Sequence, residues 1–201
     1  MNILINSLPT QIKVNNGIFE PVTDYRASIE FELMVENGEQ DIKKLLTPFF
    51  PDGLPVDLVG ATDAVLWFYS CGIEKKQENE TQPKPTDKKR VYSFSVDAEA
   101  IYSDFARFYD IDLSTANLHW WKFRALLMGL PEDSSFKKRI YYRTCELKDL
   151  PKKEQKRIRE IRKEIEIKTA QAEHTTLVER NKKMLDYVKK RSAEIQSGVT
   201  E

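Results

Sequence analysis

Leu118-His119-Trp120-Trp121-Lys122-Phe123-Arg124-Ala125-Leu126-Leu127-Met128-Gly129-Leu130-Pro131 is the stretch of sequence that decides the fold of this chain. Its apolar residues fall on nearly every side of a helical projection, which is typical of a helix buried by several neighbours. Gly129 and Pro131 then end the helix, since glycine favours helix C-termini and proline cannot continue one. The stretch predicts a central aromatic helix with other elements packed around it, and we expect a mainly α fold.

A β-hairpin is expected before the first helix. Apolar and polar residues alternate between residues 11 and 22 on either side of Asn15-Asn16-Gly17, a turn sequence that readily adopts positive backbone dihedral angles. Thr23 and Asp24 provide capping groups for a helix that runs to about residue 37. A short helix is predicted over residues 41–46 and a strongly apolar helix over residues 57–71.

Residues 74–90 contain no large apolar side chain, and they include two prolines. Such a stretch cannot bury enough surface to offset its ordering entropy, so we expect a mobile loop inserted into one compact helical domain. After an extended piece at residues 91–94, helical spacing predicts a helix over residues 97–109. A basic helix capped by Ser134 or Ser135 follows the central helix and ends near residue 144. We therefore assign residues 1–150 to the globular domain.

A long, charged C-terminal helix is predicted from Pro151 onward, because residues 152–196 contain no proline or glycine. This appendage, residues 151–201, carries a weak coiled-coil seam that is interrupted by a register slip near residues 175–176. A lone helix of this kind is marginally stable, so we expect its seam to bind a partner. The predicted partner-binding residues are Ile158, Ile161, Ile165, Val178, Leu185 and Val188.

The charge composition argues against nucleic-acid and membrane partners. Lys plus Arg equals Asp plus Glu at 32 each, so no whole-molecule field attracts the chain to phosphates or an anionic bilayer. From Pro151 onward 14 basic residues face 9 acidic ones, which makes the tail positive and the globular part negative. The longest apolar run is far short of the roughly 20 residues that span a bilayer.

No arrangement of residues indicates an enzyme, a cofactor or a metal site. His119 and His174 lie far apart, and Cys71 and Cys145 belong to no recognisable nucleophile or metal motif. The helical segments carry dispersed acidic residues, which we interpret as caps and solvated faces: Glu30, Glu32, Asp97, Glu99, Asp104 and Asp110. Two unpaired cysteines and the lack of a signal peptide indicate a reducing cytoplasm.

Four ordered motifs resemble a known family. They are Thr23-Asp24-Tyr25-Arg26 with Ile29-Glu30-Phe31-Glu32 after a Leu8-Pro9 hairpin, Leu66-Trp67-Phe68-Tyr69-Ser70-Cys71-Gly72, the Trp-Trp helix, and Gly129-Leu130-Pro131-Glu132-Asp133. This order is similar to the proteins named for "gene product fifteen" of phages of Gram-positive bacteria. The resemblance covers about residues 2–150, and the Trp-Trp segment with its Gly-Leu-Pro-Glu-Asp end is its most specific part.

The resemblance implies a non-enzymatic role in tail assembly. Genes of this family lie among the tail genes of long-tailed phages, beside the tape-measure gene, and their products are taken to be tail assembly chaperones. The resemblance thus implies a protein of the host cytoplasm whose partner is the tape-measure protein, held soluble before the tail tube polymerises. The alternative is a structural component of the tail or head-tail joint that forms a homo-oligomer through its C-terminal helix.

Overall fold

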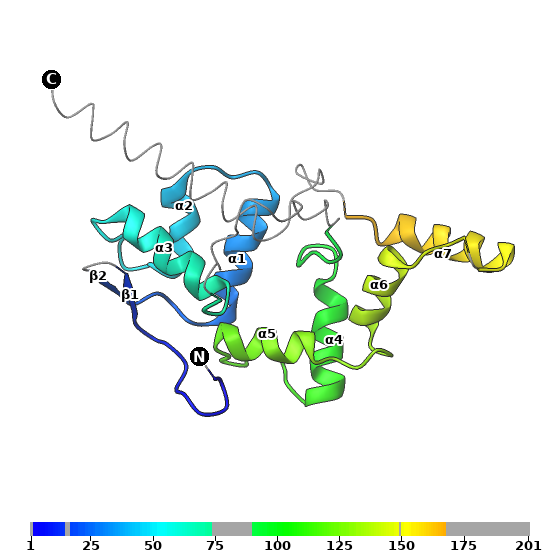
Figure 1. Ribbon diagram of the computed structural model, residues 1–201, viewed down its shortest axis with the longest axis horizontal. Helices are drawn as coiled ribbons and strands as arrows, with labels where there is room; N and C mark the ends of the chain where they lie inside the picture. Colours follow the sequence, from blue (N-terminus) through cyan, green and yellow to red (C-terminus); the bar gives the residue numbers. More distant parts are fainter. Residues whose placement is uncertain (1, 15–16, 74–89, 149, 168–201) are drawn as a thin grey trace, which may run out of the picture.

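The described part of the chain folds into a mainly helical structure with one small β-hairpin (Figure 1). The computed structural model describes residues 2–14, 17–73, 90–148 and 150–167. In chain order the elements are β1 (Ile12–Val14), β2 (Gly17–Phe19), α1 (Tyr25–Glu36), α2 (Ile42–Leu46), the 3-10 helix η1 (Thr47–Phe49), α3 (Leu58–Tyr69), α4 (Ala98–Tyr109), α5 (Trp120–Met128), α6 (Ser135–Thr144) and α7 (Lys152–Glu164). The predicted fold class and hairpin are confirmed.

The N-terminal hairpin packs on α3. Its strands pair antiparallel, with Ile12 opposite Phe19 and Val14 opposite Gly17, while the predicted turn residues 15–16 lie outside the described residues. Ile12 and Phe19 are buried, and Gly60 of α3 makes room for the Phe19 ring: a Cβ there would lie 2.9 Å from Phe19 Cζ. The small sheet therefore covers one side of α3 and closes that end of the core.

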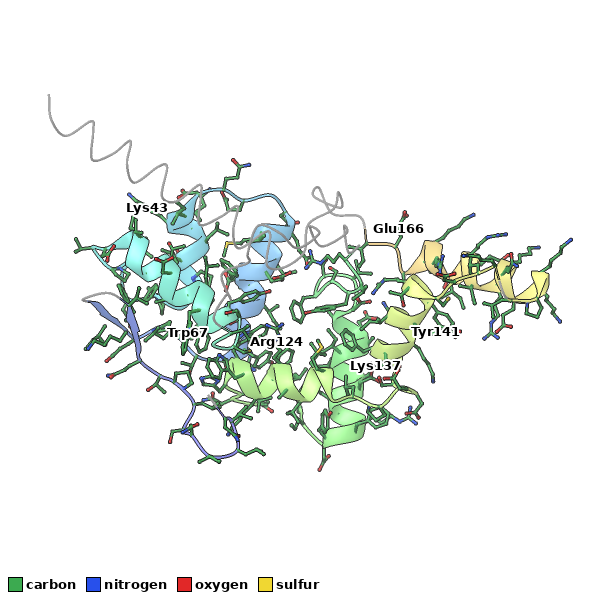
Figure 2. The ribbon with its side chains drawn as sticks, viewed as in Figure 1. Lys43, Trp67, Arg124, Lys137, Tyr141 and Glu166 are labelled. Atoms are coloured by element: carbon green, nitrogen blue, oxygen red, sulfur yellow. The ribbon has the colours of Figure 1, made fainter. Side chains whose placement is uncertain are left out.

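The aromatic helix α5 contributes Trp120, Trp121, Phe123 and Leu127 to the core. Trp120 and Trp121 donate their indole N–H groups to the carbonyls of Tyr69 and Phe68, at 2.9 and 2.7 Å. Arg124 Nη1 donates to the Tyr69 carbonyl as well, at 3.1 Å, and Figure 2 shows this side chain where α3 meets α5. These donors satisfy carbonyls that the last turn of any helix leaves without intrahelical partners. The Trp-Trp pair therefore fixes α5 to the end of α3 by both packing and capping.

The expectation that α5 is covered on nearly every side is wrong for one strip of its surface. Lys122, Ala125 and Met128 are exposed, whereas Trp120, Trp121, Phe123 and Leu127 are buried. The helix also begins at Trp120 instead of Leu118, because the His119 side chain accepts a hydrogen bond from the Trp121 N–H and caps it.

Several acidic residues are buried, contrary to our interpretation of them as caps and solvated faces. Glu32, Asp97 and Asp104 are inaccessible to solvent, whereas Glu30, Glu99 and Asp110 are exposed as expected. Each buried carboxylate has partners from elsewhere in the chain, which a single sequence does not show. The Asp104 carboxylate accepts hydrogen bonds from the Ser135 and Phe136 N–H groups at the start of α6, at 3.1 and 2.7 Å. The buried carboxylates of these helices therefore join elements that are distant in sequence.

Arg90 lies at the edge of the predicted loop, and it belongs to the folded core. Its guanidinium forms ion pairs with the buried Glu32 and Glu36 carboxylates of α1. Glu36 also accepts a hydrogen bond from Ser93 Oγ at 2.9 Å. The remainder of the predicted mobile loop, residues 74–89, lies outside the described residues. The second half of the chain therefore joins the first through a buried ionic cluster.

The long C-terminal helix is not supported, because α7 ends at Glu164. The helix begins after Pro151 as predicted, yet no proline or glycine is present where it stops. Arg143 of α6 donates to the Ile165 carbonyl from Nε and Nη2, at 3.0 and 2.7 Å. These bonds replace the intrahelical partner that the carbonyl would find in a continuing helix, so a tertiary contact accompanies the end of α7. Residues 168–201 lie outside the described residues.

Candidate functional site

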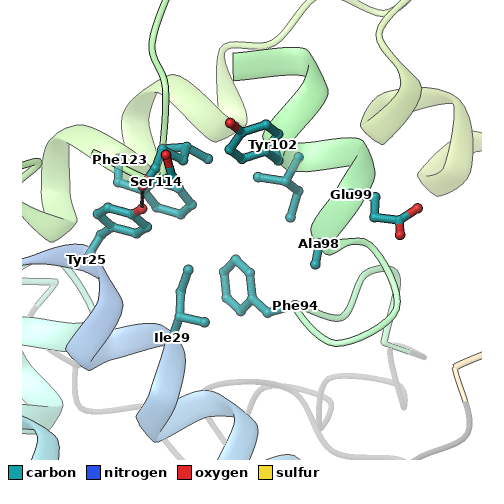
Figure 3. Close-up of a pocket in the computed structure, with 10 residues that line it drawn as sticks. Tyr25, Ile29, Phe94, Ala98, Glu99, Tyr102, Ser114 and Phe123 are labelled. Carbon is teal, nitrogen blue, oxygen red and sulfur yellow. Dashed lines mark hydrogen bonds between the residues drawn. The ribbon is translucent and has the colours of Figure 1, made fainter. Parts of the chain in front are cut away.

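An apolar pocket opens between α1 and α4, above α5. Figure 1 shows α1 and α4 on two sides with α5 crossing beneath them, and Figure 3 shows the hollow that they enclose. Its volume is about 440 Å³. The lining residues come from four segments, namely α1, α4 together with a residue shortly before it, the segment before α5, and α5 itself: Tyr25, Ile29, Phe94, Ala98, Glu99, Ile101, Tyr102, Leu113, Ser114 and Phe123.

The floor of the pocket is a stack of aromatic rings. Tyr25 stacks on Phe123 with ring centroids 4.6 Å apart, and Phe123 stacks on Phe105 at 5.0 Å. The Tyr25 hydroxyl donates to the Leu113 carbonyl at 2.6 Å, and burial raises the pKa of this phenol. Because its hydroxyl is already bonded, Tyr25 presents an apolar ring face to an occupant.

The mouth of the pocket is exposed and carries negative charge. Ala98, Glu99, Tyr102 and Ser114 are all exposed, and the Glu99 carboxylate projects away from the hollow in Figure 3. The Tyr102 hydroxyl donates to Asp112 Oδ1 at 2.9 Å, and this bond to a carboxylate raises the pKa of Tyr102. Ser114 donates to the same oxygen, and its hydrogen bonds lower the pKa of Asp112. An apolar occupant with flanking basic groups would match this mouth.

The histidine beside the tryptophans has a structural role. His119 Nδ1 accepts from the Trp121 N–H at 3.1 Å, so the ring proton lies on Nε2, which donates to the Pro9 carbonyl at 3.0 Å. Burial lowers the pKa of this imidazole, which favours the neutral form that the cap requires. Across the described ranges, no group of three or more His, Cys, Asp or Glu side chains is placed to hold a metal ion.

A second buried ionic cluster ties α4 to α6 and to the end of α7. Asp97, fully buried, accepts from Arg143 Nη1 and Nη2 at 2.7 and 2.8 Å, from Arg139 Nη1 at 3.2 Å and from the Ser93 N–H at 3.0 Å. Arg143 therefore links the carboxylate at the start of α4 to the Ile165 carbonyl. This cluster holds the wall of the pocket and the last described residues in one unit.

Part of the predicted partner-binding seam is buried within the chain itself. Ile158 and Ile165 are buried, with 2% and 7% of their surface exposed, and Ile161 is partly buried. On the same helix, Arg162 donates to the Tyr142 and Cys145 carbonyls at the end of α6, both at 2.5 Å. The physical reason is that α7 packs against α6 instead of standing free. Val178, Leu185 and Val188 lie outside the described residues.

The pocket residues escaped the sequence analysis because they come from four separate segments. Their aromatic side chains are indistinguishable by type from those of the core, and the sequence predicted only a buried aromatic helix with other elements packed around it. The motif Thr23-Asp24-Tyr25-Arg26 was the available signal, since Tyr25 lines the pocket and Arg26 Nη2 donates to the Leu113 carbonyl beside it, at 2.8 Å.

Comparison with known proteins gives a family. The family model described as "Bacteriophage Gp15 protein" matches residues 4–167. No curated protein and no solved structure gives a significant match. Within the described parts of the chain, no helix has both the length and the apolar character needed to cross a membrane. The matched region contains the hairpin, all of the helices described above and the pocket, so this chain belongs to the bacteriophage Gp15 protein family.

Proposed function

We propose that this phage protein is a tail assembly chaperone, which binds the tape-measure protein in the host cytoplasm before the tail tube polymerises. Family membership supports a structural or tail-region role for a phage protein. The observation that carries the finer proposal is the open, largely apolar pocket between α1 and α4. A chaperone for a long helical client needs such a surface, because the client exposes apolar side chains until the tube encloses it.

The pocket has the size and lining that suit side chains from an amphipathic helix. Its volume of about 440 Å³ falls within the range of protein binding pockets. Two helices form its walls and aromatic rings form its floor, as in the grooves that accept helical peptides through side chains at spacings of three and four residues. The proposal therefore places client binding on the pocket, in addition to any binding by the C-terminal residues Val178, Leu185 and Val188.

We expect no enzymatic step in this function and no cofactor. His119 is engaged as a helix cap, and the Asp97 and Asp104 carboxylates are buried in hydrogen bonds with arginine and backbone groups. Binding and release of a client are sufficient for the proposed role.

Co-purification with the tape-measure protein of the same genome tests the proposal. Ala98→Trp adds a large side chain at the exposed mouth of the pocket, and we expect it to reduce the recovered tape-measure protein at least about tenfold, the effect of losing one well-packed anchor. Ala125→Trp is the matched control, since Ala125 is exposed on α5 and does not line the pocket. Equal recovery with both variants would place the client elsewhere, and no recovery with the unaltered protein would reject the chaperone proposal.

Purified virions distinguish the alternative role. A chaperone leaves before the tail is complete, so we expect its absence from mature particles. Stoichiometric amounts in virions, together with a homo-oligomer in light scattering, would instead favour a structural component of the tail or head-tail joint.

A further inference from the structure

The apolar pocket lies open in the described part of the structure, and the chain itself contains a segment that matches it. We propose that residues 182–190, Lys-Lys-Met-Leu-Asp-Tyr-Val-Lys-Lys, occupy the pocket between α1 and α4 of the same molecule when no other partner is bound. Occupation by this segment concerns the free protein, so it does not depend on the identity of the client.

The apolar residues of this segment match the pocket in type and spacing. Met184, Leu185 and Val188 stand three and four residues apart in the sequence, the spacing of the side chains with which peptides anchor in such grooves. The pocket floor presents the rings of Tyr25 and Phe123, and Ile29 lies on the α1 side. Burial of two or three such side chains against these rings provides the attraction.

Charge favours the same pairing. The stretch from Arg180 to Arg191 has six basic residues and one acidic residue, and its basic residues flank the apolar ones on both sides. The exposed mouth carries Glu99 and, bonded to Tyr102, Asp112. Arg26, a basic side chain beside the pocket, is already paired with Asp24 at 3.1 Å. Opposite charges at the rim orient a segment whose centre is apolar.

The chain leaves its last described residues close to the pocket. The Ile165 carbonyl and the Asp97 carboxylate share the guanidinium of Arg143, and Asp97 directly precedes Ala98 and Glu99 in the pocket wall. Residues 168–181 lie between this point and the proposed segment, and at up to about 3.3 Å per residue this stretch can span up to about 46 Å. A tether of this kind gives an effective concentration of about a millimolar, which makes even a weak contact populated.

Photo-cross-linking in the full chain tests the proposal. Tyr102→p-benzoylphenylalanine places the reactive group at the mouth of the pocket, and peptide mapping by mass spectrometry identifies the residues that it captures. We expect capture of residues 182–190, with a yield that does not change on dilution, because the contact is within one molecule. Val56→p-benzoylphenylalanine is the control position, since Val56 is fully exposed and does not line the pocket.

Substitutions in the segment make the test specific. Leu185→Asp combined with Val188→Asp is expected to lower the cross-linking yield at least about tenfold, since each buried aliphatic side chain contributes enough attraction for such a change. Val178→Asp, outside the segment, should leave the yield unchanged, and circular dichroism checks that all variants remain folded. Capture of other parts of the chain, an equal yield in the double variant, or a yield that rises with protein concentration would overturn the proposal, the last by indicating a second copy.

Discussion

Arg143 is the residue whose loss most directly tests the physical account of this fold. Its guanidinium donates twice to Asp97, twice to the Ile165 carbonyl and once to the Val91 carbonyl at 3.1 Å. Only 9% of the Arg143 side chain is exposed, and Asp97 is fully buried. Arg143→Met retains most of the aliphatic volume and removes all five hydrogen bonds.

The expected loss in the free energy of unfolding follows from what remains around Asp97. Removal of one partner from a buried ion pair costs about 3–5 kcal/mol, because a buried charge is left without compensation. Arg139 and the Ser93 N–H still bind the carboxylate, so we expect the lower end, about 3 kcal/mol. For a protein of this size that corresponds to a fall of roughly 6–12 °C in the melting temperature.

Arg139→Met is the matched comparison. Arg139 makes one hydrogen bond to Asp97, at 3.2 Å, and 29% of its side chain is exposed. Solvent screens such a pair, so we expect a cost of about 1 kcal/mol or less. Arg143→Lys should fall between the two, because lysine keeps the charge and loses the planar fork that bonds both oxygens.

Urea denaturation followed by tryptophan fluorescence measures these differences, since Trp120 and Trp121 are buried in the core. In a double-mutant cycle, Asp97→Asn and Arg143→Met together should cost less than the sum of the two single substitutions, because both remove the same ion pair. Equal losses for Arg139→Met and Arg143→Met, or a loss below about 1 kcal/mol for Arg143→Met, would refute the central role of this ion pair.

Three further predictions concern α5 and its neighbours. Trp121→Ala should lower the free energy of unfolding by about 3–5 kcal/mol, because it leaves a cavity and removes the hydrogen bond to the Phe68 carbonyl. Trp121→Phe should lower it by about 1–2 kcal/mol in the same urea assay. Gly72→Ala should lower the free energy of unfolding by at least about 1–2 kcal/mol, because Gly72 has a φ of +70° and a Cβ there would lie 2.9 Å from Trp121 Cη2. An unchanged melting temperature would contradict this expectation. The pKa of His119 is lower in the native protein than in the unfolded chain, so the unfolded chain takes up a proton on this imidazole at a higher pH. The contribution of His119 to the free energy of unfolding is therefore complete above the ordinary pKa of 6.5, and it falls as the pH drops from there toward the native pKa. His119→Asn keeps a capping oxygen and should flatten this part of the pH profile of melting temperature, and an unaltered slope would show that His119 does not cause it.

The sequence predicted those features that depend on neighbouring residues. Asp24 begins α1 because its side chain accepts the N–H of the residue two positions on, and Ser134 begins α6 in the same local way. The hairpin and the aromatic helix were likewise predicted from short-range patterns. All of these features are fixed within one or two turns of chain, where residue types alone carry the information.

Features that depend on distant partners could not be predicted in this way. Asp97 has the position of a helix cap, yet its carboxylate turns inward because two arginines from α6 meet it there. No local sequence signal marks the end of α7 at Glu164. The Ile165 carbonyl instead accepts a hydrogen bond from Arg143, which is distant in sequence. The pocket requires residues from four segments to meet, and the seam through Ile158 is covered by a helix that pattern alone does not place against it.

The backbone bridge between the start of α1 and the start of α5 bears on the order in which a newly made chain folds. Tyr25 N–H donates to the Leu118 carbonyl at 2.9 Å, and Trp120 N–H donates to the Thr23 carbonyl at 2.8 Å. The tryptophans that cap α3 arrive on the same segment. Until the ribosome has released this segment, α1 and α3 lack the surface that covers their aromatic faces, and contacts so distant in sequence form slowly. A chain that stops before residue 118 is therefore expected to aggregate during synthesis, because the aromatic faces of α1 and α3 stay uncovered.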